Sequence, residues 1–268
     1  MLVTVDTGGT KTLVTSFSRN GKPGEPFRYP TPRNEDEYVA TLIEFIHEKY
    51  AGKTIDAIII GVPGMVKDNR AIWCENLGWK DFDLARPIHK AFHCPVWLEN
   101  DANLAGLAET KALPTIPAMS LYVTISTGIG TGIITEGKIN PGLAQSEGGH
   151  SLVEYDGALR QWESFASGQA IYRTYGKYAR DIQSKSTWRQ IADKISRGFL
   201  PIIPILQPEV IIIGGSIGTY FDRYYTTLRQ LLDDHLPPHI IRPEIRQAAH
   251  PEEAVVYGCY YYAKDRLS

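Results

Sequence analysis

The sequence predicts an α/β fold made of two domains. With 268 residues, the chain is long enough for two modest α/β domains that each bury a core. Short apolar runs typical of buried strands alternate with stretches whose apolar residues recur at helical spacing. Three of the strands lead directly into glycine-rich turns, so the same strand-then-turn unit recurs along the chain.

The first half of the chain reads as strands with a helix between them. Leu2–Val5 and Leu13–Ser18 flank the first glycine turn and predict a β-hairpin. A helix over residues 38–46 follows, because apolar residues recur there at helical spacing after Asn34, a preferred helix cap. Ala57–Ile60 is expected as a buried strand, since it shows no polar alternation.

A later strand brings polar residues to its end. Val96–Leu98 is expected as a strand whose carboxyl end carries Glu99-Asn100-Asp101. The Ala- and Leu-containing stretch Ala102–Lys111 predicts a helix that starts there. Pro114-Thr115-Ile116-Pro117 resembles a linker. We place the domain boundary in it, with residues 1–115 before it and 116–250 after it.

The second half begins with another hairpin and continues into helices. Ser120–Ile125 and Ile133–Thr135 predict its strands, on either side of the turn Ser126–Gly132. The remaining predicted elements are the helices Phe165–Arg180, Thr187–Leu200 and Tyr220–His235, the apolar strand Val210–Ile213, and a terminal helix that starts at Pro251 and runs through Tyr262.

The segment Asp6-Thr7-Gly8-Gly9-Thr10-Lys11-Thr12 suits a nucleoside triphosphate. Gly8 and Gly9 allow a tight turn whose backbone N–H groups approach phosphate oxygens. The three threonines add hydroxyl donors, Lys11 adds a positive charge, and Asp6 can hold magnesium through water. Taken alone, the segment is equally well a polar hairpin turn. It has neither the Walker spacing nor the dinucleotide-binding spacing of glycines.

Two more glycine turns of the same character follow downstream. The turn after Ser120–Ile125 supplies Thr127, Gly128 and Gly130. The turn after Val210–Ile213 begins with Gly214-Gly215. Three such turns, two of them lined with threonine, are suited to clamp a nucleotide from opposite sides.

Composition and charge exclude several classes of function. The net charge of -2 gives no reason to expect nucleic acid or polyphosphate as a partner. No apolar run approaches the ~20 residues that a membrane span needs. The chain begins directly with a strand, so we expect no signal peptide. Cys74, Cys94 and Cys259 are dispersed and odd in number, as in reduced proteins. We therefore expect a cytoplasmic globular protein.

Taken together, these segments resemble the ROK group of bacterial sugar kinases. Asp6–Lys11 resembles the first phosphate loop of that family, Ser126–Gly132 its second, and Ile213-Gly214-Gly215 its adenosine motif. Further matching segments, in the family's order, are Gly61-Val62-Pro63-Gly64, Asn76-Leu77-Gly78-Trp79, Glu99-Asn100-Asp101-Ala102-Asn103 and Glu147-Gly148-Gly149-His150. The resemblance covers the chain from Asp6 to about Gly258.

This resemblance implies the two-domain actin-like ATPase (ribonuclease H-like) fold, with a ligand cleft between the domains. It implies that the C-terminal helix, at about 251–268, returns to the first domain. It also implies ATP and Mg²⁺ as cofactors, a small-molecule sugar as partner, and a homodimer.

Resemblance assigns roles to three residues around the predicted strand ends. Asp101 is implied to be the general base, although by residue type it is more simply a cap of the helix that it begins. Asn100 and Asn76 are implied to bind sugar hydroxyls, for which an amide is both donor and acceptor. Their alternatives are an ordinary turn amide and a turn residue beside a buried Trp79.

Three more residues are implied to bind the sugar. By resemblance, Glu147 and His150 bind hydroxyls near the anomeric end, and Glu163 is the last sugar-binding acid, at the start of a helix. A single histidine is otherwise an ordinary structural residue. Glu163 is otherwise a first-turn acid that complements the helix dipole.

The sequence departs from most of the family after His150. In relatives a cysteine cluster follows the histidine and binds zinc together with it, whereas residues 151–163 here contain no cysteine. A structural zinc site needs about four closely placed Cys or His ligands. We therefore expect no zinc, and we expect the packing of Leu159 and Trp162 to replace it.

The resemblance implies an ATP-dependent hexose kinase, with glucose phosphorylated at its 6-hydroxyl as the first expectation. N-acetylglucosamine, N-acetylmannosamine, fructose, mannose and allose are alternative substrates, and polyphosphate is an alternative donor. The alternative of another class is a non-catalytic sugar sensor, which needs neither Asp101 nor the phosphate loops. We do not expect a repressor, because the chain starts at the first phosphate-loop strand with no DNA-binding module ahead of it.

Overall fold

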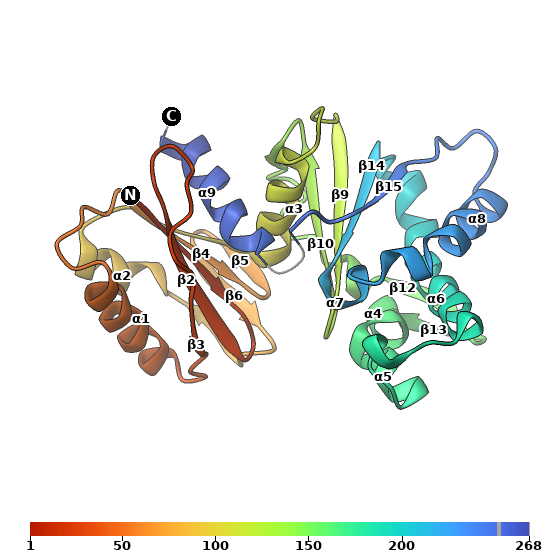
Figure 1. The fold of residues 1–268 in the computed structure, drawn as a ribbon, viewed down its shortest axis with the longest axis horizontal. Coiled ribbons are helices and arrows are strands. Elements are labelled where there is room, and N and C mark those ends of the chain that lie inside the picture. Colours follow the sequence, from red (N-terminus) through yellow and green to blue (C-terminus); the bar gives the residue numbers. More distant parts are fainter. Residues whose placement is uncertain (251–252, 268) are drawn as a thin grey trace. The chain divides into compact units, whose positions relative to one another are not determined.

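The computed structural model describes residues 1–250 and 253–267, and its contacts divide the chain into two compact units (Figure 1). The first unit comprises residues 1–108 and the C-terminal segment from residue 253, and the second comprises residues 109–252. The units are α/β in composition, as the sequence predicts. Within the described residues, no helix combines the length and the apolar character that crossing a membrane requires.

The first unit contains a five-stranded sheet of order β3-β2-β1-β4-β8. β1 pairs antiparallel with β2, and the strands β1, β4 and β8 run parallel to one another. The strands are β1 (Leu2–Thr7), β2 (Lys11–Phe17), β3 (Phe27–Pro30), β4 (Ala57–Val62) and β8 (Val96–Asn100). A separate small sheet consists of β5 (Met65–Lys67), β6 (Arg70–Cys74) and β7 (Trp79–Phe82).

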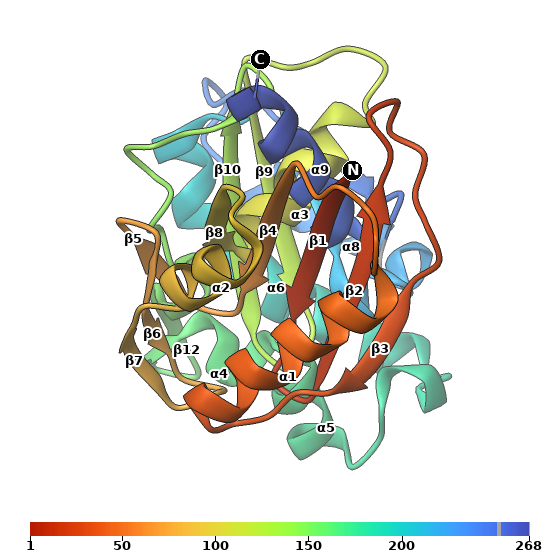
Figure 2. The ribbon, with the colours of Figure 1, turned by 90° about the vertical axis from the view of Figure 1, so that its left-hand side faces the viewer.

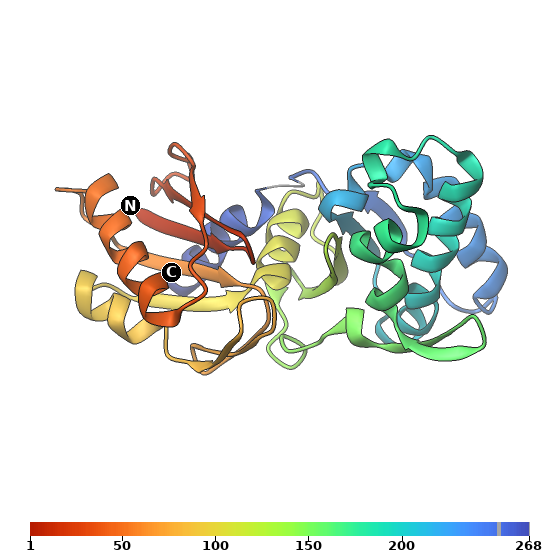
Figure 3. The same cartoon turned by 90° about the horizontal axis from the view of Figure 1, so that it is seen from below.

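Helices cover both faces of the five-stranded sheet. They are α1 (Glu35–Lys49), α2 (Ala85–Phe92), α3 (Asp101–Lys111) and α9 (Ala254–Leu267). Figures 2 and 3 show α1 and α2 over one face and α9 over the other. This explains why Ile58, Ile59 and Ile60 of β4 form an unbroken apolar run: all three are fully buried. The Asn34 side chain accepts from the Glu37 N–H at the start of α1, which confirms the predicted cap.

The second unit contains a five-stranded sheet of order β11-β10-β9-β14-β15. Its strands are β9 (Met119–Ile125), β10 (Ile129–Thr135), β11 (Lys138–Ile139), β14 (Val210–Gly214) and β15 (Glu244–Gln247). A separate two-stranded hairpin consists of β12 (Leu152–Tyr155) and β13 (Ala158–Gln161). Its helices are α4 (Trp162–Ala166), α5 (Gly168–Tyr175), α6 (Lys185–Leu206), α7 (Gly215–Gly218) and α8 (Tyr225–His235). A 3₁₀ turn spans Gly148–His150.

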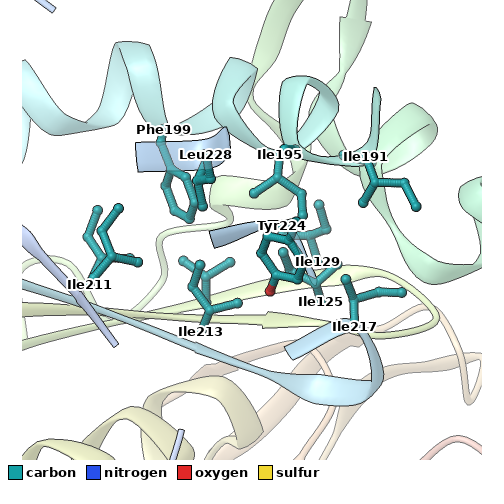
Figure 4. Packing of buried hydrophobic residues seen from close by; sticks show 14 of the residues in the cluster. Ile125, Ile129, Ile191, Ile195, Phe199, Ile211, Ile213, Ile217, Tyr224 and Leu228 are labelled. Carbon is teal, nitrogen blue, oxygen red and sulfur yellow. The ribbon is translucent and has the colours of Figure 1, made fainter. Parts of the chain in front are cut away.

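The core of the second unit lies between α6, α8 and this sheet. Figure 4 shows Ile191, Ile195 and Phe199 of α6 above the isoleucines of the sheet. Among those isoleucines, Ile211 and Ile213 come from β14 and are fully buried. The motif-bearing turns after β9 and β14 therefore extend from a well-packed sheet.

Several predicted helices differ from those observed. The helix predicted over Tyr220–His235 begins only at Tyr225, after a 3₁₀ turn over Phe221–Arg223. The stretch Phe165–Arg180 was expected as one helix, but the chain breaks at Ser167, whose side chain accepts from the Ala170 N–H and caps α5. Helical apolar spacing continues across the break, so the periodicity alone did not reveal it. The helix expected to end at Leu200 continues to Leu206, with two prolines inside it.

The division of the chain falls between Ala108 and Glu109, inside α3, whereas we placed it within residues 114–117. The Leu104 side chain packs against the Gly61 position of β4, which belongs to the first unit. One turn later, the Glu109 carboxylate accepts hydrogen bonds from the N–H groups of Ala249 and His250 in the second unit, at 2.6 and 2.7 Å. The first part of α3 thus packs within the first unit, and its last turn is hydrogen-bonded within the second unit.

The C-terminal helix runs further than the sequence indicated. It was predicted from Pro251 through Tyr262 within a segment of about 251–268, and α9 covers Ala254–Leu267. Pro251, Glu252 and Ser268 lie outside the described residues. α9 packs on β1 and β4.

Candidate functional site

The candidate residues of the first unit gather where its parallel strands end. The register pairs Asp6 of β1 with Gly61 of β4, and Gly61 with Glu99 of β8. Asn100 and Asp101 follow at once, at the end of β8 and the start of α3. In open α/β sheets, ligands bind outside the carboxyl ends of the parallel strands. The topology therefore brings Asp6, Asn100 and Asp101 to the edge of the sheet where such sites occur.

The first glycine turn is a closed hairpin turn whose tip is exposed. The Gly8 N–H donates to the Lys11 carbonyl at 3.0 Å, and Thr10 and Lys11 are exposed. The Cβ position at Gly9 lies 3.4 Å from the Cβ of Asn76, which follows β6. The structure thus joins the predicted phosphate turn to the Asn76 loop.

Two of the three threonines predicted to donate from this turn have other partners. The Thr7 hydroxyl is buried and bonds to the Tyr38 hydroxyl at 2.6 Å. Thr12 is buried as well, and its hydroxyl bonds to that of Thr31 at 2.9 Å. Strand alternation turns both side chains inward, so the prediction that they serve as ligand donors was wrong, and Thr10 is the threonine exposed at the turn.

The Asp6 carboxyl titrates abnormally. Burial raises its pKa from 3.8 to about 6, and the positive charge of Arg28 offsets only part of that rise. A raised pKa means that the carboxylate lacks sufficient compensation in this environment. A hydrated divalent cation would supply it, so the residue fits the role of holding Mg²⁺ through water.

The cap of α3 is Asn100. Its side-chain oxygen accepts from the Asn103 N–H at 3.0 Å, and its amide donates to the Gly64 carbonyl at 3.0 Å. Asp101 occupies the first helical position, and one of its carboxylate oxygens accepts from the Ala102 N–H at 2.8 Å. The interpretation of Asp101 as the helix cap was therefore wrong. Asn100 retains a second N–H and a second lone pair for a ligand.

Glu99 is a residue that the sequence argument did not single out. One carboxylate oxygen accepts from the Asn100 N–H at 2.8 Å and from the Asn103 side chain at 3.0 Å. Burial raises the pKa of this carboxyl, while hydrogen bonds from the Asn103 side chain, the Asn100 backbone and Tyr262 of α9 lower it. Glu99 therefore bonds to the backbone directly before Asp101 and to the Asn103 side chain after it. A glutamate directly before Asn-Asp at a strand end was the available signal.

In the second unit, Glu147, His150 and Glu163 come together. Nε2 of His150 lies 4.0 Å from a carboxylate oxygen of Glu163, and both side chains are partly exposed. Burial raises the pKa of Glu147, the charge of His150 lowers it, and that of Glu163 raises it. The short distance between His150 and Glu163, and the effect of both charges on the Glu147 pKa, place the three side chains in one local environment. Acceptors and an imidazole arranged in this way suit the binding of several hydroxyl groups.

Glycine brings the Glu147–His150 turn against β10. A Cβ at Gly149 would lie 2.0 Å from the Ile129 carbonyl oxygen, which no larger residue tolerates. The Gly148 N–H donates to the Thr131 hydroxyl at 3.0 Å. The glycines between the predicted sugar-binding residues therefore allow a close approach of two backbones.

Glu163 also bonds to the second glycine turn. Its carboxylate accepts from the Ile129 N–H at 3.1 Å and lies 2.7 Å from the Cβ position of Gly128. Thr127 is exposed at this turn, while Gly130 lies within β10 and pairs with Thr124. The strand thus begins earlier than predicted, and Gly130 is not part of the turn itself.

The third glycine turn packs beside the second. Gly215 has φ of 78°, and a Cβ there would lie 2.6 Å from the carbonyl oxygen of Ile125. The Gly168 N–H, at the start of α5, donates to the Ser126 carbonyl at 2.6 Å. Gly214 ends β14 directly before this turn. The turns after β9 and β14 and the start of α5 therefore form one contiguous group in the second unit.

The segment without cysteines forms the β12–β13 hairpin. Trp162 is fully buried, as expected, and its indole N–H donates to the Lys194 carbonyl at 3.2 Å. Leu159 is 72% exposed, so its predicted packing role was wrong. It pairs with Glu154 on the outer face of the hairpin, while Val153 faces inward. The described residues contain no group of three or more His, Cys, Asp or Glu side chains that could hold a metal ion.

Comparison with known proteins places the chain in a family. The sequence profile of the ROK family matches residues 2–266. The N-acetylmannosamine kinase of Yersinia pestis (strain Pestoides F) is 29% identical over 291 residues, covering 98% of each chain. The fructokinase of Pediococcus pentosaceus is 26% identical over 243 residues, covering 81% of this chain and 80% of its own.

A solved structure gives the fold. The inorganic polyphosphate/ATP-glucomannokinase from Arthrobacter sp. strain KM is 25% identical, with a TM-score of 0.78 over 99% of this chain and 98% of its own. The predicted actin-like ATPase fold of two domains is thereby confirmed. With the profile match over nearly its whole length, the chain belongs to the ROK family.

Proposed function

We propose that the protein is an ATP-dependent sugar kinase that transfers a phosphoryl group to a hexose, with the 6-hydroxyl of glucose as the first candidate acceptor. Phosphoryl transfer needs a positioned base, donors for the phosphate charge and a metal ion. The candidate residues offer each of these parts. They also offer a group of polar side chains suited to sugar hydroxyls.

The observation that carries this proposal is the hydrogen-bonded frame around Asp101. Glu99 and Asn100 fix the backbone before and after it, and Asn100 takes over the capping of α3. Asp101 is left at the amino end of the helix, where the dipole favours an ionised carboxylate. A general base needs this combination of fixed position and ionised state.

Each other residue has a role that its surroundings support. The first turn with its exposed Thr10 and Lys11, together with the turns at Gly128 and Gly214-Gly215, would bind the phosphates and adenosine. Mg²⁺, held through water by Asp6, would neutralise phosphate charge. Asn76, Asn100, Glu147, His150 and Glu163 would bind the sugar.

The acceptor is tested by a panel of sugars. The names of the relatives above indicate three different acceptors: N-acetylmannosamine, fructose, and glucose with mannose. Membership of the family therefore leaves the sugar open. We expect ADP release from ATP and Mg²⁺ with one sugar of a panel containing glucose, mannose, fructose and the N-acetylated hexosamines. Replacing ATP by polyphosphate in the same assay tests the alternative donor.

A sugar sensor without catalysis is the alternative of another class. It predicts that calorimetry detects binding of a sugar but that no ADP is formed with any donor. Folded protein that binds a sugar but stays silent across the panel would contradict the kinase proposal.

Glu163 is expected to serve both the sugar and the second glycine turn. Glu163→Ala removes the acceptor for the Ile129 N–H and should weaken binding of a non-hydrolysable ATP analogue about tenfold. Glu163→Gln keeps an oxygen for that N–H, so nucleotide affinity should stay within about threefold of wild type. Both variants should lose sugar affinity. Equal nucleotide affinity in the two variants would contradict the role at the turn.

A further inference from the structure

A cavity of about 580 Å³ lies in the second unit, apart from the candidate site residues. It is lined by the β12–β13 hairpin and by α4, α5 and α6. Its charged lining residues are Asp156, Arg160, Arg173, Arg189, Asp193 and Lys194. Glu163 of α4 contacts the second glycine turn and is not part of this lining.

Lys194 is a largely buried residue whose side chain lines this cavity. The residue is 5% exposed, and its ammonium lies 4.5 Å from the ring centroid of Tyr155, which stacks on Phe165. Across residues 1–250 and 253–267, no carboxylate and no hydrogen-bond acceptor pairs with this ammonium. The ammonium nitrogen itself keeps contact with water at the cavity, and the ring of Tyr155 contributes a cation–π interaction. The ammonium is therefore accessible to an anion that enters the cavity.

The three arginines of the cavity are exposed to solvent and have few partners in the chain. In the described parts of the chain, Arg160 and Arg189 form neither an ion pair nor a side-chain hydrogen bond, and Arg173 reaches only the Ser164 carbonyl, at 3.5 Å. Of the two lining carboxylates, Asp193 already accepts from Arg197 at 3.0 Å. The four cations thus exceed the two carboxylates, one of which is already engaged.

We propose that this cavity binds a small molecule that carries a phosphoryl group. Guanidinium groups bind phosphate oxygens in bidentate fashion, and an ammonium adds a point charge. The volume lies within the range of small-molecule pockets, roughly 300–1,000 Å³. A phosphate monoester fits this space, and inorganic phosphate shares the recognised chemistry.

The β12–β13 hairpin contributes two side chains to one side of the cavity. Val153 and Arg160 are directly opposite each other in the β12–β13 register, so they share a face. Val153 is buried, which places that face inward, and Arg160 lines the cavity. Tyr155, two residues on, lies on the same face and holds the Lys194 ammonium. The β12–β13 hairpin thus supplies both Arg160 and the ring over which Lys194 lies.

Binding is measured by calorimetry with glycerol 3-phosphate, inorganic phosphate and, as a control, glycerol. Wild-type protein is saturated with a non-hydrolysable ATP analogue, so that phosphate turns at the candidate site are occupied. Glycerol 3-phosphate should bind and glycerol should not. Binding of inorganic phosphate alone would also support the phosphoryl site and would assign it to free phosphate. Absence of heat with both phosphates would overturn the proposal.

Two lysine variants on α6 distinguish binding in the cavity from a general effect of positive charge. Lys194→Met keeps the apolar stem and removes the ammonium, and it should weaken glycerol 3-phosphate at least about tenfold. Lys185→Met removes an exposed lysine of the same helix outside the cavity lining and should leave affinity unchanged. Equal affinity in both variants would refute the site. Thermal unfolding checks that each variant is folded, and this readout is independent of kinase activity.

Discussion

Asp101→Asn is expected to lower kcat by about 10²–10⁴-fold while leaving sugar binding within severalfold of wild type. An amide cannot accept the proton of the attacking hydroxyl, but its oxygen can still accept from the Ala102 N–H as the carboxylate does. The frame made by Glu99 and Asn100 does not involve the Asp101 side chain, so α3 should still begin at the same residue. Steady-state turnover and calorimetric sugar affinity measure the two effects separately.

The comparison variant is Asn103→Ala, which removes an amide that bonds to Glu99 and keeps the carboxylate of the proposed base. It should lower thermal stability more than Asp101→Asn does, because Asn103 is buried. Turnover of Asp101→Asn within severalfold of wild type would contradict the assignment of Asp101 as the base.

Asp6→Asn should increase the stability of the ligand-free protein and abolish its Mg²⁺-dependent activity. The folded-state pKa of Asp6 lies at about 6, above the ordinary 3.8, so the folded protein binds a proton more tightly than the unfolded chain. This group therefore reduces stability as pH rises from about 3.8 to 6, and the loss persists at higher pH. The full difference between the two pKa values corresponds to about 3 kcal/mol of folding free energy. Because the side chain is partly exposed, the stability gained by Asp6→Asn should be smaller than this.

Urea unfolding at pH 8 and at pH 4.5 without nucleotide measures this effect, and the gain from Asp6→Asn should shrink at the lower pH. Asp56→Asn is the control of opposite sign. Hydrogen bonds from Arg19 and the N-terminal ammonium lower the pKa of Asp56 to about 2, so its carboxylate stabilises the fold above about pH 4. Asp56→Asn should therefore destabilise the protein at pH 8. A destabilised Asp6→Asn variant at pH 8 would contradict the account of Asp6.

The strands could be predicted where burial produces a recognisable apolar pattern in the sequence. Ile58 to Ile60 form an apolar run because helices cover both faces of the sheet, and the Asn34 cap is readable because it acts three residues away. The break at Ser167 was not predictable in this way, since the apolar spacing runs on through it. The exposure of Leu159 also depends on which face of a short hairpin packs inward.

By itself, the sequence determined the α/β class, the glycine turns and their order, and hence the family. These properties are local, because a turn that needs glycine and a strand that is buried constrain the residues within a few positions. Tertiary structure alone decided which residue caps α3, that Glu99 bonds to residues on both sides of Asp101, and that Glu163 bonds to the second glycine turn. A hydrogen bond between positions 129 and 163 leaves no periodic trace, because it arises only when the fold brings the two segments together.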